Sequence, residues 1–228
     1  MSARQQVLLS WSSGKDSATA LAALRADPAV ELRGLFTSLN AETGRVAVHD
    51  VRRGLLRAQA AAAGLPLFEV ALPSPCPNFE YLARVREALE PLMEDGVEAM
   101  AFGDLHLSDV RRFREDQCTE LGLGHRFPLW GRETRALAEE MIASGLQATL
   151  TCVDPKVLDP SFAGRPFDAA LLDALPEGAD PCGENGEFHT FVHACTAFRA
   201  PIEVVRGERV ERGGFVFCDV IPRDGADQ

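Results

Sequence analysis

This chain has no long apolar run, no Cys-x-x-Cys pair and no basic tract, and each absence makes one class of protein less probable from the sequence. No run of about 18 apolar residues occurs, so we expect no membrane-spanning helix and no membrane partner. The six cysteines form no Cys-x-x-Cys pair, and the N-terminus enters an apolar run too early for a signal peptide. These features predict reduced thiols and a cytoplasmic location. The net charge of −11 disfavours a nucleic-acid partner.

Lysine is also scarce, since only two of the 23 basic residues, Lys15 and Lys156, are lysines. Lys15 lies in SWSSGKDS, residues 10–17, between the apolar run 7–9 and a segment with helical apolar spacing. A strand, a tight turn and a helix form an anion site, because the first helical N–H groups have no internal partners. Gly14 permits close backbone approach, and the serine hydroxyls can donate to phosphate. We therefore predict a phosphate-binding loop.

This loop resembles that of the PP-loop ATP pyrophosphatases, usually written SGGKDS. It differs from a Walker A loop, because Leu9 stands where that pattern has a glycine, and Ser13 replaces one glycine of the PP-loop pattern. PP-loop enzymes hold the β- and γ-phosphates as a unit, so that the α-phosphate is attacked and pyrophosphate leaves. The resemblance implies ATP with Mg²⁺, Lys15 on the β- and γ-phosphates, and Asp16 orienting the loop or the Mg²⁺ ion. The implied ATP-binding loop residues are Ser12, Ser13, Gly14, Lys15, Asp16 and Ser17.

Strand and helix patterns alternate through the first half of the chain, which predicts a parallel sheet covered on both faces. We expect a five-stranded α/β, Rossmann-like nucleotide-binding domain over residues 1–129. Asp50 and Asn78 are predicted N-caps, and Gly64 is a predicted C′ glycine. The expected strands are residues 7–9, 30–37, 67–72, 99–102 and 125–129, and the expected helices are residues 18–24, 51–63, 79–94 and 107–121.

Ligands of such folds bind beyond the carboxyl ends of the strands. The phosphate loop, Thr37 and the Gly103-Asp104 pair all follow predicted strands, so we expect them to converge. Thr37, Gly103 and Asp104 therefore complete the predicted ATP site. Asp104 is a second candidate contact for Mg²⁺ or for the ribose.

Residues 130–228 differ in character and predict a smaller α+β substrate domain that faces the phosphate loop. The predicted elements are helices at 133–144 and 167–175, a strand at 148–153 and a C-terminal hairpin around Gly213-Gly214. Between them, residues 180–191 form a polar, glycine-containing segment, DPCGENGEFHTF. This segment is either a surface loop, a functional loop or part of a zinc site. The zinc alternative would use Cys182, His189, His193 and Cys195.

Residues 182–191, CGENGEFHTF, resemble the C-terminal signature of the diphthine–ammonia ligase family, a branch of the PP-loop ATPases. That pattern runs close to GE-x-GE-[YF]-HT. Further matches at Gly103-Asp104, 128–130 and 157–165 extend the resemblance over nearly the whole chain, and the short length resembles a bacterial branch. The family fold is a five-stranded nucleotide-binding domain followed by a smaller substrate domain, which agrees with the division near residue 130.

The resemblance implies an ATP-dependent ligase that adenylates a carboxylate, so that ammonia or an amine displaces AMP and forms an amide. The family substrate is diphthine, a modified histidine of translation elongation factor 2. Glu187 or His189 could take a proton from ammonium. The implied catalytic residues are Lys15, Asp16, Glu187 and His189, and the implied acceptor-binding residues are Glu184, Asn185, Glu187, His189 and Thr190.

Two other functions fit the same phosphate loop. A tRNA-modifying enzyme predicts a basic face and, for thiolation, a reactive cysteine, for which Cys182 is the candidate. A non-catalytic ATP-binding sensor would tolerate the loss of Glu184, Glu187 and His189. The acceptor carboxylate, the nitrogen donor and a homo-oligomeric state stay open, and His49 is either a helix-start residue or a ligand.

Overall fold

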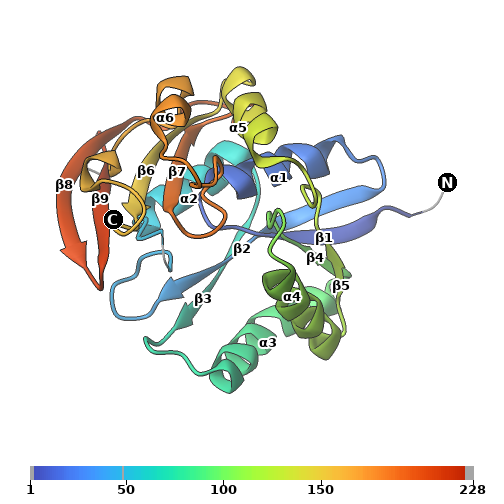
Figure 1. Cartoon of the computed structure of the whole chain (residues 1–228). Coiled ribbons are helices and arrows are strands. Elements are labelled where there is room, and N and C mark those ends of the chain that lie inside the picture. Colours follow the sequence, from blue (N-terminus) through green and yellow to red (C-terminus); the bar gives the residue numbers. More distant parts are fainter. Residues whose placement is uncertain (1–2, 48, 224–228) are drawn as a thin grey trace.

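The computed structural model describes residues 3–47 and 49–223 and contains one parallel and one antiparallel sheet (Figure 1). The parallel sheet has the strand order β3-β2-β1-β4-β5, so β1 occupies its centre. The predicted α/β, Rossmann-like fold is therefore confirmed. Its strands are β1 (Gln5–Ser10), β2 (Val30–Asn40), β3 (Leu67–Leu72), β4 (Ala99–Ala101) and β5 (Gly124–Arg126).

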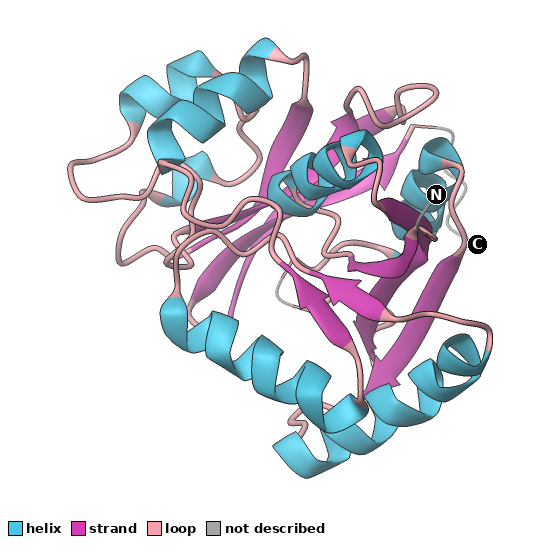
Figure 2. Ribbon diagram, turned by 90° about the vertical axis from the view of Figure 1, so that its right-hand side faces the viewer, coloured by secondary structure: helices cyan, strands magenta, loops and turns pink. Residues whose placement is uncertain are grey.

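Helices cover both faces of this sheet (Figure 2). Successive side chains of a strand point to opposite faces, so β1 contributes to two cores. Val7 and Leu9 pack with residues of α1 and α2, whereas Leu8 packs with residues of α3 and α4. None of the helices in the described part of the chain has the length and apolar character needed to cross a membrane. The four helices are α1 (Lys15–Ala26), α2 (Arg53–Ala63), α3 (Asn78–Glu94) and α4 (Ser108–Leu121).

The second half of the chain forms the antiparallel sheet, in the order β7-β6-β9-β8. The predicted hairpin is present, with Gly213 and Gly214 at positive φ angles of 59° and 83° between β8 and β9. The elements of the second half of the chain are α5 (Thr134–Ala143), β6 (Gln147–Val153), the 3-10 helix η1 (Pro160–Phe162), α6 (Ala169–Ala174), β7 (Phe188–Ala194), β8 (Val204–Arg212) and β9 (Phe215–Pro222).

Asp50 does not cap α2, contrary to the prediction. Arg52 occupies the N-cap position, and Asp50 has a φ of 55° and an ion pair with Arg212 at 2.8 Å. Asp50 thus lies two residues before the N-cap, and its carboxylate is held by Arg212 instead of by the helix-start N–H groups. Gly64 ends the helix with a φ of 65°, as predicted.

Other predicted boundaries also shift. Asn78 is the first residue of α3 and not its cap, because Pro77 holds the N-cap position with a φ of −63°. The fifth strand ends at Arg126 instead of residue 129, since Phe127 leaves the sheet to stack on Phe102 with ring centroids 5.5 Å apart. The first helix begins at Lys15, three residues earlier than expected.

The prediction of a loop throughout residues 180–191 is wrong at its end. Residues 188–191 belong to β7, which pairs with β6. Phe188, Thr190 and Phe191 are buried there, so this aromatic and β-branched stretch behaves as an ordinary core strand.

The two sheets share one hydrophobic cluster, which includes residues of β1, α1 and α2 together with residues of β6, β7 and β9. Polar bonds also cross between them. Asp219 of β9 accepts from Arg45 at 3.0 Å and from Arg52 at 2.6 Å. Because the core is continuous, the division at residues 129 and 130 stays a prediction from the sequence.

Candidate nucleotide and acceptor site

A cavity of about 500 Å³ lies where β1 and β4 end, and both halves of the chain line it. This is the point at which the strand order of the parallel sheet reverses, the usual ligand position in open α/β sheets. The cavity is large enough for a small-molecule ligand. Its polar and charged lining includes Ser12, Lys15, Asp16, Ser17, Thr37, His49, Asp104, Arg114, Glu184, His189 and Thr190.

The phosphate loop leaves β1 through a strained turn that β7 and α2 hold. Ser13 has a φ of 73°, a left-handed conformation that favours glycine. The Ser13 carbonyl accepts from the Val192 N–H and from the Gln59 side chain, both at 3.0 Å. Gln59 is fully buried and also accepts from the Trp11 indole at 2.9 Å. These bonds fix the loop backbone in the absence of the second glycine.

Lys15 opens α1 and is 2% exposed. Its backbone N–H donates to the Thr190 hydroxyl at 3.1 Å. Its ammonium group donates to Asp16 at 2.9 Å and to the Cys182 carbonyl, and it lies 5.2 Å from the centre of the Phe188 ring. Burial has the largest single effect and lowers the pKa of Lys15, but the neighbouring acidic groups, Asp16 first, together raise it above its ordinary value. The lysine is therefore a buried cation between the two halves.

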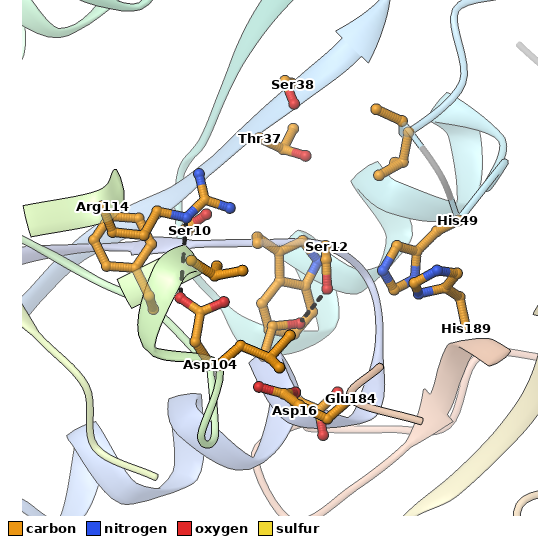
Figure 3. A pocket seen from close by; sticks show the side chains of 18 of the residues that line it. Ser10, Ser12, Asp16, Thr37, Ser38, His49, Asp104, Arg114, Glu184 and His189 are labelled. Carbon is orange, nitrogen blue, oxygen red and sulfur yellow. Dashed lines mark hydrogen bonds and ion pairs between the residues drawn. The ribbon is translucent and has the colours of Figure 1, made fainter. Parts of the chain in front are cut away.

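Two carboxylates of the cavity keep an unused oxygen. Oδ1 of Asp16 and Oδ2 of Asp104 are buried and have no hydrogen-bond partner among residues 3–47 and 49–223. Asp16 and Asp104 lie near each other (Figure 3), and burial raises the pKa of both carboxyl groups. Orphaned carboxylate oxygens suit a Mg²⁺ ion that also takes oxygens from phosphate. This donor set fits the predicted magnesium contact.

Gly103 lets the loop after β4 approach the phosphate loop. A Cβ atom at this position would lie 3.0 Å from the carbonyl carbon of Asp16 and 3.1 Å from the Ser17 nitrogen. Backbone atoms cannot move aside cheaply, so only glycine fits. The predicted convergence of Gly103 and Asp104 with the loop is thus found.

The predicted acceptor residues divide into two groups. Glu184 lines the cavity and accepts from the Leu105 N–H at 2.7 Å, which ties the second half to the loop after β4. Burial raises the pKa of Glu184. Glu187 is buried away from the cavity lining, where it accepts from the Asp180 N–H at 2.9 Å and from the Asn185 side chain at 3.0 Å. Asn185 and Glu187 therefore hold the backbone of residues 180–187 from the side that does not line the cavity.

His49 and His189 form a tilted pair at the cavity wall, with ring centroids 4.7 Å apart and ring planes at 46° (Figure 3). The Nδ1 atom of His49 lies 3.0 Å from the Thr190 carbonyl, so Nδ1 carries the hydrogen and donates. Burial lowers the pKa of His49 to about 4 and that of His189 well below its usual value. Both imidazoles are therefore neutral near pH 7.

Thr37 lies within β2, three residues before the end of that strand, and still reaches the cavity. Its buried hydroxyl finds no hydrogen-bond partner in the described part of the chain. Arg114 of α4 also lines the cavity, and the sequence prediction did not include it. Its only sequence signal is its position on the helix that follows Gly103-Asp104. The sequence left open whether His49 starts a helix or contacts a ligand, and the structure places it in the cavity lining.

The zinc alternative and the reactive cysteine receive no support. Among the described residues, no group of three or more His, Cys, Asp or Glu side chains could hold a metal ion. The Cys182 thiol is 1% exposed and donates to the Thr134 carbonyl at 3.3 Å. Burial raises its pKa to about 12, so it stays a thiol.

The fold and the cavity define a two-sheet α/β protein with a phosphate loop at the switch point of its parallel sheet. Comparison with family models places the diphthamide synthase N-terminal domain on residues 5–125 and the diphthamide synthase C-terminal domain on residues 133–222. The first match alone covers more than half of the chain. The chain belongs to the diphthamide synthase family, which confirms the resemblance found in the sequence.

Curated relatives carry the name diphthine–ammonia ligase. The proteins of Bos taurus and Homo sapiens are 35% and 34% identical over 148 residues, or 62% of this chain and 53% of each relative. The protein of Schizosaccharomyces pombe is 34% identical over 128 residues, or 54% of this chain and 21% of the relative. The chain thus spans about half the length of the mammalian relatives it matches.

Proposed function

We propose that this protein is an ATP-dependent ligase that adenylates a carboxylate, releases pyrophosphate, and transfers ammonia or an amine to form an amide. The observation that carries the proposal is the bond between the Lys15 N–H and the Thr190 hydroxyl, because it joins the phosphate loop to the acceptor strand in one cavity. The name of the curated relatives, diphthine–ammonia ligase, supports the same chemistry.

The phosphate loop and the start of α1 would hold ATP. The N–H groups of the loop and the helix start, the Ser12 and Ser17 hydroxyls and the Lys15 ammonium would provide donors for the phosphates. Asp16 and Asp104 would hold Mg²⁺ through their unused oxygens. A bound Mg²⁺ would supply positive charge at the phosphate oxygens.

Two displacements complete the reaction. A carboxylate oxygen of the acceptor attacks the α-phosphorus, and the bond to the β-phosphate breaks, so pyrophosphate leaves with the electron pair. The nitrogen of ammonia then attacks the acyl carbon, and the bond to AMP breaks. Lys15 and the helix-start N–H groups stabilise the charge that develops in the first step. One proton must leave the attacking nitrogen in the second step.

His189 is the better acceptor of that proton among the two residues predicted for it. Its ring is neutral and lines the cavity, whereas both carboxylate oxygens of Glu187 already accept hydrogen bonds from Asp180 and Asn185. Glu184, His189 and Thr190 would contact the acceptor. Asn185 and Glu187 would hold the segment that presents them. We therefore assign Glu187 a positioning role.

Purified protein incubated with Mg·ATP, ammonium and an acceptor tests the proposal. The acceptors would be a pool of cell metabolites and elongation factor 2 that carries diphthine. We expect AMP and pyrophosphate in amounts equal to the amide formed, and loss of both in Lys15→Ala. Lys156→Ala is the matched control, because it removes the second lysine of the chain from an exposed position. ATP binding without turnover for every acceptor would favour the non-catalytic sensor.

A further inference from the structure

Arg114 lines the cavity and keeps one hydrogen-bond donor without a partner among the described residues. Its guanidinium carbon lies 5.1 Å from the centre of the Phe102 ring and 5.9 Å from that of Phe113, which holds the group in place. The Nε atom is buried and has no hydrogen-bond partner within the described residues. Asp104 Oδ2, which also lacks a hydrogen bond, forms a long ion pair with this Nε atom at 3.9 Å (Figure 3). A half-buried cation whose buried Nε–H has no acceptor indicates a ligand.

The surroundings of Arg114 differ from those of the phosphate loop. Tyr81 and Phe113 form an aromatic wall with ring centroids 6.5 Å apart, and Val110 adds an aliphatic side chain beside them in the cavity lining. The loop serines follow β1 and Lys15 begins α1, whereas Tyr81 lies on α3 and Val110 and Phe113 lie on α4. An arginine beside an apolar wall suits a carboxylate attached to an apolar body.

We propose that Arg114 binds the carboxylate of the acceptor and that Asp104 controls when it can do so. This inference rests on the proposed function and names the residue that selects its substrate class. An ionised Asp104 attracts Arg114 and repels an approaching carboxylate. When Asp104 holds Mg²⁺ with ATP, that charge no longer competes for the guanidinium. The nucleotide therefore binds first and the carboxylate second, which keeps the acceptor out of a site that lacks ATP.

Phenylacetate is a suitable probe, with phenylacetamide as its neutral control. The NMR signal of the Arg114 Nε–H group, assigned by its loss in Arg114→Lys, is followed as each compound is added. With Mg²⁺ and a non-hydrolysable ATP analogue present, we expect phenylacetate to shift this signal saturably and phenylacetamide to leave it unchanged. Without nucleotide we expect no shift in the native protein and a saturable shift in Asp104→Asn. The Arg111 signal should not move, because Arg111 is paired with Glu115 at 2.7 Å outside the cavity lining.

Calorimetry of ATP binding distinguishes whether Arg114 binds the acceptor carboxylate or the phosphates of the nucleotide. We expect Arg114→Gln and the matched Arg111→Gln to bind ATP within about twofold of the native affinity. A loss of about tenfold or more in Arg114→Gln alone would assign the arginine to the nucleotide and overturn the inference. An unmoved Nε–H signal in Asp104→Asn would also overturn it. Neither measurement needs turnover, so failure to release AMP would contradict the ligase proposal and leave these results standing.

Discussion

The hydroxyl of Thr190 accepts a hydrogen bond from the backbone N–H of Lys15 at 3.1 Å, across 175 residues of sequence. The Ncap residue of α1, Gly14, has no side chain that could satisfy this N–H. Thr190, a residue of β7 in the second sheet, therefore caps α1, the helix that follows the turn of the phosphate loop. One buried hydrogen bond thereby links the predicted phosphate loop to the predicted acceptor strand.

Thr190→Val should remove this cap while it keeps the size and shape of the side chain. We expect a loss of about 1–2 kcal/mol in the free energy of unfolding, because a buried N–H is left without a partner. ATP affinity should fall by about tenfold as the loop relaxes. Urea unfolding and calorimetry measure the two effects. Thr190→Ser keeps the hydroxyl and should behave as the native protein, and equal losses in both variants would contradict the capping role.

Ser13→Gly should stabilise the protein. A left-handed conformation costs a non-glycine residue about 1–2 kcal/mol, whereas the added freedom of an unfolded glycine costs about 0.5–1 kcal/mol. The φ of 73° at Ser13 therefore predicts a gain of up to about 1 kcal/mol, or about 2–4 °C in Tm. Thermal unfolding measures it. Ser13→Ala keeps the strain and should gain less, so an equal or larger gain in that variant would refute the argument.

Much of the site was predictable because its motifs stand at strand ends. The phosphate loop, Gly103 and Asp104 converge as expected, since parallel strands place their carboxyl ends at one edge of a sheet. Arg114 was not predictable, because an arginine on an amphipathic helix is usually a surface residue and only the packing on Phe102 turns it inward. His49 was ambiguous, since its role depends on the Thr190 carbonyl, which lies 141 residues away.

Glu187 shows a second reason why the sequence alone does not place every residue of the site. The signature indicated a functional carboxylate, but its spacing says nothing about which of two nearby glutamates faces the cavity. The turn through Gly183 and Gly186, with φ angles of 65° and 89°, directs Glu184 to the lining and Glu187 to the backbone behind it. The Asp50 cap prediction failed for a related reason, because its partner Arg212 is distant in sequence.

His49 should make the stability depend on pH. Burial lowers its pKa to about 4, against the Thr190 carbonyl, which raises it. The unfolded chain therefore binds a proton below pH 6.5 that the folded protein does not bind. The resulting stability is complete above pH 6.5 and decreases as the pH falls towards 4, by on the order of 3 kcal/mol in all.

The variant His49→Asn removes this titration and keeps a donor in reach of the Thr190 carbonyl. Its free energy of unfolding should therefore decrease less steeply than that of the native protein between about pH 6.5 and pH 4. Urea unfolding at a series of pH values measures both curves. Parallel curves would show that His49 is not buried as a neutral group.

Asp219 should contribute more to stability than an exposed acid with a similar pair. It accepts from Arg45 and Arg52 and is 22% exposed, whereas Asp173 pairs with Arg135 and is 75% exposed. We expect Asp219→Asn to cost about 1–3 kcal/mol, because two arginines lose a half-buried partner, and Asp173→Asn to cost less than about 0.5 kcal/mol. Urea unfolding compares them. Similar losses would mean that the contact between the sheets does not depend on Asp219.

Transfer of ¹⁸O tests the central claim, attack of a carboxylate on the α-phosphate, most directly. The acceptor that supports turnover is labelled in its carboxylate and incubated with Mg·ATP and ammonium, and the products are analysed by mass spectrometry. The account predicts one ¹⁸O atom in AMP for each amide formed, with unlabelled pyrophosphate. Labelled inorganic phosphate together with ADP would place the attack on the γ-phosphate and contradict the account.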